Sequence, residues 1–223
     1  SGVYDLPCAE HLMAFMLAQS RNLPAALSEN SCASGSAEWN ALRAGCRPLA
    51  GQSVLILGYG AIAEMFVQLL APFNMNVTAV RRSPTGSERV PTVALDALPG
   101  VLGQADHIIS ILPESAQTLN FVDAKFLAEV KAGAAFYNIG RGTTVNQADL
   151  ADALRSQHLH SAWLDVTDPE PLPEEHPLRD LPNCHITPHT AGGHLGESLS
   201  VIRHFLKNLQ AFESGQPLQN RIM

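Results

Sequence analysis

SVLILGYGAIAEM, residues 53–65, is the stretch that decides the fold of this chain. Its first five residues, of which the last four are apolar, predict a strand buried on both faces, and a helical pattern over 61–71 follows at once. Between them, Gly58 permits a tight turn, Gly60 permits close approach of the backbone, and Ala63 lets the helix pack tightly. A helix that begins here offers free N–H groups to an anion. This order favours a dinucleotide-binding site, and a plain turn is the alternative.

Strands alternate with helices along the rest of the chain. The patterns predict strands at 75–80, 107–112, 134–139, 160–166 and 184–187, and helices at 6–23, 95–102, 123–130, 146–157 and 199–213. They predict irregular segments at 28–51 and 82–92 and a proline-rich loop at 167–183. We therefore expect an α/β fold with a doubly wound, Rossmann-like parallel sheet. Ligands of such sheets bind beyond the carboxyl ends of the strands, where Gly58, Arg141 and His189 fall.

The composition restricts the class of protein. The 223 residues suit one α/β domain, and the 46% of hydrophobic and 16% of charged residues indicate a soluble globular protein with a charged fraction on the low side. A net charge of −7 argues against a nucleic-acid partner, and no apolar run is long enough to span a membrane. The four cysteines have no zinc-site spacing and are too few for a disulfide scaffold. We expect no metal and a cytoplasmic location, where thiols stay reduced.

Several motifs together resemble the NAD(P)-binding domain of the D-2-hydroxyacid dehydrogenase family. The resemblance is carried, in order, by residues 9–11, 49–51, 58–62, 131–134, 138–142, 164–171 and 183–189. It implies hydride transfer between a nicotinamide cofactor and a small 2-oxo or 2-hydroxy acid, as in glyoxylate and hydroxypyruvate reductases. It also implies that Arg141 holds the 2-oxo acid, that His189 is the acid/base, and that Glu170 partners His189.

The three residue types suit that chemistry. A planar guanidinium grips carboxylate and ketone oxygens at two points, and an imidazole delivers a proton near neutral pH. Each residue has a plainer interpretation. Arg141 could be a solvated turn residue between two glycines, Glu170 an exposed loop carboxylate, and His189 the residue that ends a strand.

The resemblance places cofactor contacts beyond several strand ends. The implied residues are Gly58, Tyr59, Gly60, Ala61, Ile62, Arg81, Arg82, Ser83, Leu112, Pro113, Ile139, Gly140, Asp165 and Ala191. Arg81 stands where an NAD-specific member has an aspartate, and arginine attracts the 2′-phosphate, so we favour NADP(H) over NAD(H). The alternatives are a solvated loop at Arg81 and Arg82 and a capping role for the Asp165 carboxylate.

The resemblance also implies a domain arrangement. We expect 1–223 to be the cofactor domain, with a crossover helix and dimer-type connection at 1–50 and the start of a return to an absent substrate domain at 214–223. Some apolar surface on the first and last helices should then be uncovered. Without a domain to close the cleft, this chain could be inactive alone.

Two other functions stay open, with one question about assembly. A nucleotide-sensing binding protein, like the corepressors of this fold, would bind the cofactor without turnover. A structural dimerisation module would use the first helix and the connection after it. In a homodimer, Phe15, Met16 and Trp39 would face the partner, and otherwise they are core residues.

Overall fold

The computed structural model describes residues 2–220. Within them, one parallel sheet has the strand order β3-β2-β1-β4-β5-β6-β7. The strands are β1 (Ser53–Leu57), β2 (Asn76–Val80), β3 (Thr92–Val93), β4 (His107–Ser110), β5 (Ala134–Asn138), β6 (Leu159–Leu164) and β7 (Cys184–Ile186). The predicted Rossmann-like fold class is confirmed.

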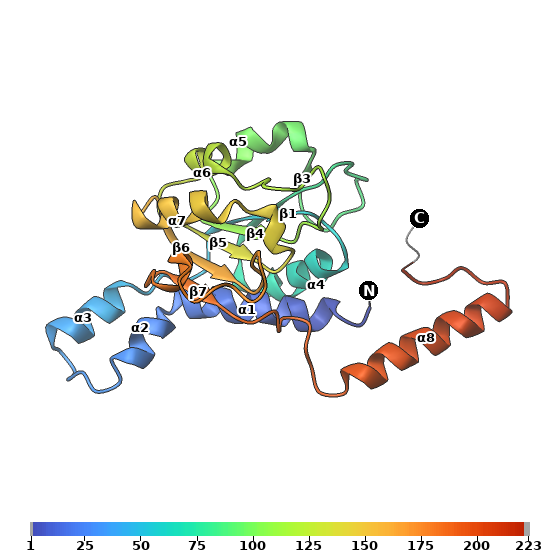
Figure 1. Cartoon of the computed structure of the whole chain (residues 1–223), viewed down its shortest axis with the longest axis horizontal. Coiled ribbons are helices and arrows are strands. Elements are labelled where there is room, and N and C mark those ends of the chain that lie inside the picture. Colours follow the sequence, from blue (N-terminus) through green and yellow to red (C-terminus); the bar gives the residue numbers. More distant parts are fainter. Residues whose placement is uncertain (1, 221–223) are drawn as a thin grey trace.

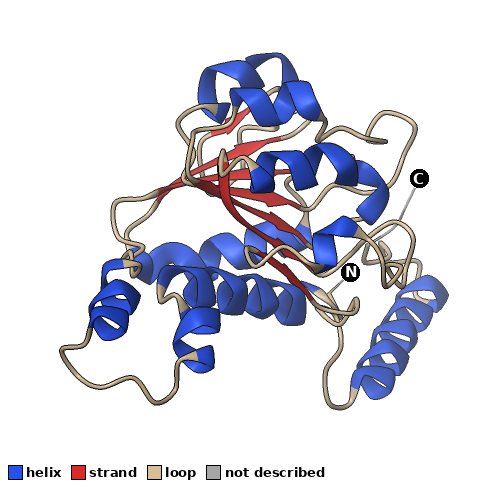
Figure 2. Ribbon diagram, turned by 60° about the vertical axis from the view of Figure 1, so that its left-hand side comes forward, coloured by secondary structure: helices blue, strands red, loops and turns tan. Residues whose placement is uncertain are grey.

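Helices lie on both faces of the sheet (Figures 1 and 2). They are α1 (Asp5–Ser20), α2 (Leu23–Ser28), α3 (Ala37–Ala44), α4 (Ala61–Leu70), α5 (Leu98–Leu102), α6 (Ala124–Glu129), α7 (Gln147–Arg155) and α8 (Glu197–Glu213). Short 3-10 turns are η1 (Ala71–Phe73), η2 (Leu95–Ala97), η3 (Gly142–Thr144) and η4 (Pro177–Arg179).

The apolar run of β1 contributes to two cores at once. Leu55 and Leu57 pack with α5, α6 and α7 on one face. Val54 and Ile56 pack with α1 and α4 on the other. Successive side chains of a strand point to opposite faces, so a strand covered on both sides needs a continuous apolar run. This requirement explains why the sequence pattern located β1 correctly.

The strand order changes direction beside β1. The chain proceeds from β1 to β2 and β3 on one side, then returns to place β4 on the other side of β1. The loops after β1 and β4 therefore diverge, and in sheets of this type ligands bind at the carboxyl ends of the two strands where this happens. Gly58 follows β1 and Leu112 follows β4, so both predicted cofactor residues border this switch point.

The prediction of an irregular 28–51 segment is wrong in part, because α3 lies within it. The Ser36 hydroxyl accepts a hydrogen bond of 3.1 Å from the backbone N–H of Trp39 and caps the helix. The predicted 6–23 helix also ends early. Pro24 stands in the first turn of α2, where its missing N–H costs nothing. The predicted 82–92 loop ends in β3, which is too short to show an alternating pattern.

Phe15 and Met16 are core residues, so the hypothesis that they face a partner subunit is wrong. Met16 is fully buried, and the Phe15 ring centroid lies 5.3 Å from that of Trp163 on β6. Trp39 is half-buried and carries the Arg43 guanidinium over its ring, 4.4 Å from the centroid. The inner face of α1 is therefore used to cover the sheet.

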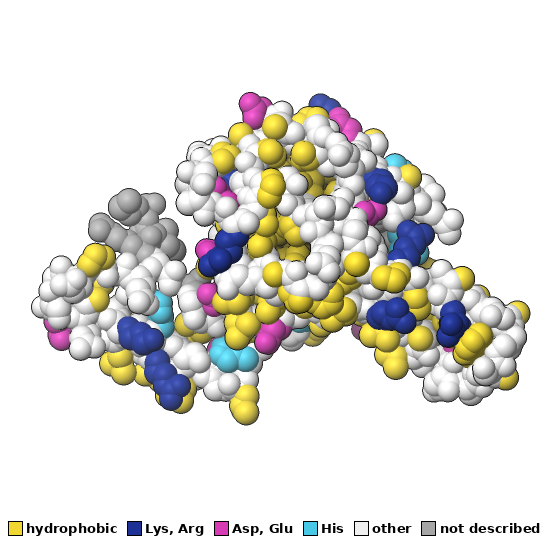
Figure 3. Space-filling model, turned by 180° about the vertical axis from the view of Figure 1, so that it is seen from behind, with side chains coloured by type: hydrophobic (Ala, Val, Ile, Leu, Met, Phe, Trp, Pro, Cys, Tyr) yellow, Lys and Arg dark blue, Asp and Glu magenta, His cyan; other side chains and the backbone are white. Residues whose placement is uncertain are grey.

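Apolar side chains are uncovered on the first and last helices, as predicted. Leu17 on α1 is exposed, and on α8 Phe205 and Phe212 are 62% and 72% exposed. Figure 1 shows α8 standing away from the sheet, and Figure 3 shows hydrophobic side chains on the surface of this part of the molecule. The domain boundaries at 1–50 and 214–223 stay predictions, and residues 1 and 221–223 lie outside the described part of the chain.

Residues 2–220 contain no helix that combines the length and the apolar character needed to cross a membrane. The same residues contain no cluster of three or more His, Cys, Asp or Glu side chains with metal-binding geometry. All four cysteines are free thiols.

Candidate active site

The turn between β1 and α4 has the conformation that its glycines predict. Gly58 has φ of +91°, in the left-handed region, and its N–H donates to the Val80 carbonyl over 2.9 Å. A Cβ at this position would lie 3.2 Å from the Ile111 carbonyl oxygen. A larger residue would thus be strained and would press on the loop after β4.

Gly60 leaves open space at the N-terminus of α4. It is the N-cap residue, and a Cβ built on it would meet no atom within 4 Å. The backbone N–H groups of the first helical turn have no partner inside a helix, so they are available to a ligand. Ala63, one turn on, is fully buried against the sheet. The close packing of α4 on the sheet and the free N–H groups at its N-terminus together fit a pyrophosphate group.

His189 and Glu170 form the pair that the sequence predicts. The Nδ1 atom of His189 lies 2.8 Å from Oε2 of Glu170, and both side chains are partly exposed. An ionised carboxylate can only accept, so Nδ1 carries the hydrogen and Nε2 is left to act on a ligand. The other carboxylate oxygen accepts from the Thr167 N–H over 3.0 Å, which orients Glu170.

Asp165 holds the loop that carries His189. Its carboxylate, 1% exposed, accepts from the Thr187 hydroxyl at 2.6 Å, the Thr190 N–H at 2.8 Å and the Ala191 N–H at 2.9 Å. The Asp165 carbonyl also accepts from the His189 N–H over 2.8 Å. The capping role considered for Asp165 is therefore confirmed, and contact with the cofactor stays a prediction.

His11 belongs to this network, although the sequence assigned it no role. Its Nε2 lies 3.2 Å from the Thr187 hydroxyl and 3.6 Å from an Asp165 oxygen. Burial lowers the pKa of His11, and the Asp165 carboxylate partly opposes that effect. The available signal was its position one turn before the buried Phe15, whose ring centroid lies 4.3 Å away.

Arg141 lies on a loop that its flanking glycines allow to pack closely. A Cβ on Gly140 would lie 2.5 Å from the Leu112 carbonyl oxygen, and one on Gly142 would lie 2.0 Å from the Thr167 backbone. Arg141 is exposed, and its Nη1 donates to the Gly140 carbonyl over 2.7 Å. Its remaining donors are available to a ligand.

The three predicted catalytic residues follow three neighbouring strands. Arg141 follows β5, Glu170 lies on the loop after β6, and His189 follows β7. The Gly142 backbone touches the Thr167 backbone, and Thr167 in turn donates to Glu170. Arg141, Glu170 and His189 therefore lie on connected loops at one edge of the sheet.

The other predicted cofactor residues lie at the same edge. The turn after β1 and the start of α4 contain Gly58, Tyr59, Gly60, Ala61 and Ile62. The loop after β2 contains Arg81, Arg82 and Ser83, and the loop after β4 contains Leu112 and Pro113. The segments after β5, β6 and β7 contain Ile139 and Gly140, Asp165, and Ala191, respectively. Ile139 and Ala191 are buried. Their contacts with a cofactor stay predictions.

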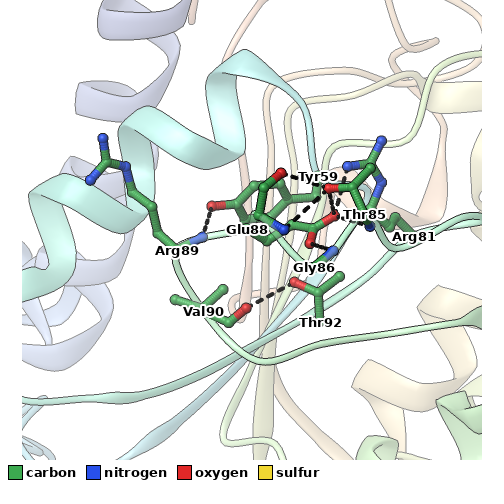
Figure 4. Close-up of polar contacts among 9 residues, drawn as sticks. Tyr59, Arg81, Thr85, Gly86, Glu88, Arg89, Val90 and Thr92 are labelled. Carbon is green, nitrogen blue, oxygen red and sulfur yellow. Dashed lines mark hydrogen bonds and ion pairs between the residues drawn. The ribbon is translucent and has the colours of Figure 1, made fainter.

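The loop after β2 closes around a carboxylate that the sequence did not single out (Figure 4). Arg81 Nη1 donates to Glu88 Oε1 over 2.9 Å. The same oxygen accepts from the Thr85 N–H at 2.8 Å and the Thr85 hydroxyl at 2.9 Å, and Oε2 accepts from the Gly86 N–H at 2.8 Å. These bonds, the one from the Thr85 backbone above all, lower the pKa of Glu88 to about 2.

The same loop is tied to the glycine turn and to α4. The Tyr59 hydroxyl accepts from the Arg89 N–H over 3.2 Å, and Arg89 Nε lies 3.2 Å from a Glu64 oxygen (Figure 4 shows the first contact). Tyr59 is the middle residue of Gly-Tyr-Gly, so this contact joins the loop after β2 to the glycine turn.

A model of the D-isomer specific 2-hydroxyacid dehydrogenase NAD binding domain matches residues 13–191. The chain belongs to this family. The glycine turn, the Arg141 loop and the His189–Glu170 pair all lie within the matched region, which begins inside α1. Family membership shows an NAD(P)-binding Rossmann domain of an oxidoreductase family.

Relatives of the family support the match along the whole chain. The chain is 32% identical to a human glyoxylate reductase/hydroxypyruvate reductase, across 96% of this chain and 66% of that protein. It spans 57% to 66% of the length of three curated relatives, the human protein among them.

The chain is similar to solved structures that contain either of the two nicotinamide cofactors. A probable 2-hydroxyacid dehydrogenase from Rhizobium etli, in complex with NADP, HEPES and L(+)-tartaric acid, matches with a TM-score of 0.86 and 26% identity, over 100% of this chain and 69% of that one. An NAD-dependent formate dehydrogenase from Staphylococcus aureus, in complex with NAD, matches with a TM-score of 0.81 and 26% identity, over 99% of this chain and 65% of that one.

Proposed function

We propose that this chain is the cofactor domain of an NADP(H)-dependent reductase that converts a small 2-oxo acid into a 2-hydroxy acid. The observation that carries the proposal is the 2.8 Å pair of His189 and Glu170, which lie on the loops after β7 and β6, near the Arg141 loop and at the same sheet edge as the glycine turn. The name of the human relative supports glyoxylate and hydroxypyruvate as substrates.

The proposed chemistry divides between cofactor and protein. When bound, the reduced nicotinamide supplies the hydride that reaches the keto carbon. Arg141 binds the carboxylate and keto oxygens of the substrate and fixes their orientation. His189 donates the proton at Nε2 to the keto oxygen, and Glu170 holds the resulting ring at Nδ1.

A titration followed by an assay tests the proposal. NADPH is added while its fluorescence is followed, and glyoxylate or hydroxypyruvate is then added while loss of the reduced cofactor is measured. We expect tight binding by this chain and turnover by a longer chain that contains it. Binding without turnover in both would favour the nucleotide-sensing alternative, and absence of binding would refute both functions.

Replacing Arg81 with aspartate and Arg82 with alanine is expected to shift cofactor preference toward NAD(H). The change removes two positive charges beyond β2 and adds one negative charge, which repels a 2′-phosphate. The ratio of the dissociation constants for NADPH and NADH should rise roughly ten- to a hundredfold. Arg82→Ala alone separates the contributions of the two arginines, since it leaves the Arg81–Glu88 contact in place. An unchanged ratio in the double variant would refute the preference.

We place this activity in the cytoplasm, where thiols such as the four found here stay reduced. We also propose a homodimer in which the outer side of α1 and α2 meets its counterpart. Leu17, Leu23 and Leu27 are exposed there, and Leu27 is the most exposed of the three. Sedimentation should give a dimer that Leu27→Glu weakens, and a monomeric wild-type chain would contradict this assembly.

A further inference from the structure

The loop after β2 contains a complete anion-binding arrangement that a side chain of the protein already fills. Two backbone N–H groups, one hydroxyl and one guanidinium converge on the Glu88 carboxylate. Successive backbone N–H groups that point into one concavity form the type of site that binds phosphates in other proteins. Here the occupant is Glu88, and its side chain is only 4% exposed.

The contact with Glu88 changes what Arg81 can offer to a ligand. Arg81 is 32% exposed and directs one terminal nitrogen at Glu88. Its positive charge is already balanced by a carboxylate 2.9 Å away. A second anion that approaches Arg81 is attracted by the guanidinium and repelled by Glu88, so its net gain is reduced.

Arg82 differs from Arg81 in its partner. Its Nη1 donates to the neutral Gln117 side chain over 3.3 Å, and Arg82 forms no ion pair with any residue in the described range 2–220. Its side chain is exposed. The two arginines therefore contribute unequally to the attraction of an anion. Glu88 balances the charge of Arg81, whereas no carboxylate in the described range balances the charge of Arg82.

Glu88 does not take the place of the acidic residue that binds ribose hydroxyls in NAD-specific sites. That residue needs free carboxylate oxygens at the surface of the cofactor groove. Both oxygens of Glu88 accept hydrogen bonds from its own loop, and the carboxylate is shielded from solvent. Its influence on a bound nucleotide therefore acts through charge and through Arg81.

We infer that Glu88 is a specificity-determining residue. It acts as an internal counter-ion to Arg81 and thereby lowers the affinity of this site for the 2′-phosphate. The inference rests on the proposed cofactor site. Glu88 then sets the relative affinity of the site for NADP(H) and NAD(H), and Arg82 is the phosphate contact whose charge is not compensated.

Binding of two small nucleotides isolates the effect of the phosphate. The probes are 2′,5′-ADP and 5′-AMP, measured by calorimetry with the full chain and no substrate. Glu88→Gln should increase the preference for 2′,5′-ADP over 5′-AMP roughly three- to tenfold. An unchanged or decreased preference would overturn the inference.

Two further variants separate charge from loop structure. Thr85→Val removes a hydroxyl contact to Glu88 without changing charge, so the preference should stay within about twofold of wild type. A gain in Thr85→Val as large as that in Glu88→Gln would mean that loop loosening causes it. In an Arg81→Gln background, the gain from Glu88→Gln should fall by at least half. A gain of the same size there would overturn the role of Arg81.

The outcomes also separate this inference from the proposed function. If 5′-AMP binds and the preference does not respond to Glu88→Gln, only the inference fails. If wild-type chain prefers the unphosphorylated nucleotide but Glu88→Gln shifts the ratio as expected, the NADP(H) proposal fails and the inference stands. If neither nucleotide binds any variant, the cofactor site itself is refuted, and the inference with it.

Discussion

Replacing His189 with glutamine is expected to lower the turnover number for 2-oxo acid reduction about a hundred- to ten-thousandfold, in a chain long enough to be active. Glutamine can still accept and donate near Glu170, but it cannot transfer a proton at neutral pH. Binding of NADPH should change little, because the glycine turn follows β1 and His189 follows β7. Steady-state rates and cofactor titration on the same preparation measure both effects.

A histidine away from the site provides the matched control. His160 is exposed on β6 near the amino end of the strand, opposite to the edge that carries His189. His160→Gln should leave the turnover number within about twofold of wild type. If His189→Gln kept a comparable rate, the assignment of the acid/base to position 189 would be wrong.

Replacing Gly142 with alanine is expected to destabilise the fold by about 3 kcal/mol or more. The new Cβ would lie 2.0 Å from the carbonyl carbon and oxygen of Thr167, and neither belongs to a flexible side chain. The Arg141 loop and the loop that bears Glu170 must therefore separate. Thermal unfolding should show a fall in the midpoint of roughly 6–12 °C for a chain of this length.

Gly100→Ala tests whether the effect comes from the contact itself. Gly100 lies in α5, and a Cβ there would meet no atom within 4 Å. Alanine favours helix relative to glycine, so this variant should be neutral or up to about 1 kcal/mol more stable. Equal midpoints for Gly142→Ala and wild type would show that the two loops yield more easily than their backbone contact indicates.

The sequence predicted the sheet well because each central strand is buried on both faces. Residues 54–57 are all buried, and such a continuous apolar run between a helix end and a glycine turn has few other interpretations. The helix at 37–44 was missed because serine, alanine and glycine around it resemble a loop. Its cap depends on a single hydroxyl, Ser36, which is also a common loop residue.

The candidate site likewise contains residues that the sequence predicted and residues that it missed. Glu170 and His189 were found because their motifs are local and the resemblance names them. His11 lies 176 positions from its partner Thr187, so no local pattern could connect the two. Glu88 sits seven residues after Arg81 in a polar loop, where a carboxylate is the ordinary occupant. Only the fold shows that its carboxylate faces inward.

The buried carboxylate at position 165 has a mechanical consequence for the reactive imidazole. Residues 187–191 form no helix or strand beyond β7, yet Asp165 receives three hydrogen bonds from them and lies beside His11 on α1. A stretch of irregular backbone is thereby braced against both the sheet and a long helix. His189, the proposed proton donor, is therefore partly exposed to solvent on a backbone that is held in place, and its ring direction is fixed by Glu170 before a substrate binds.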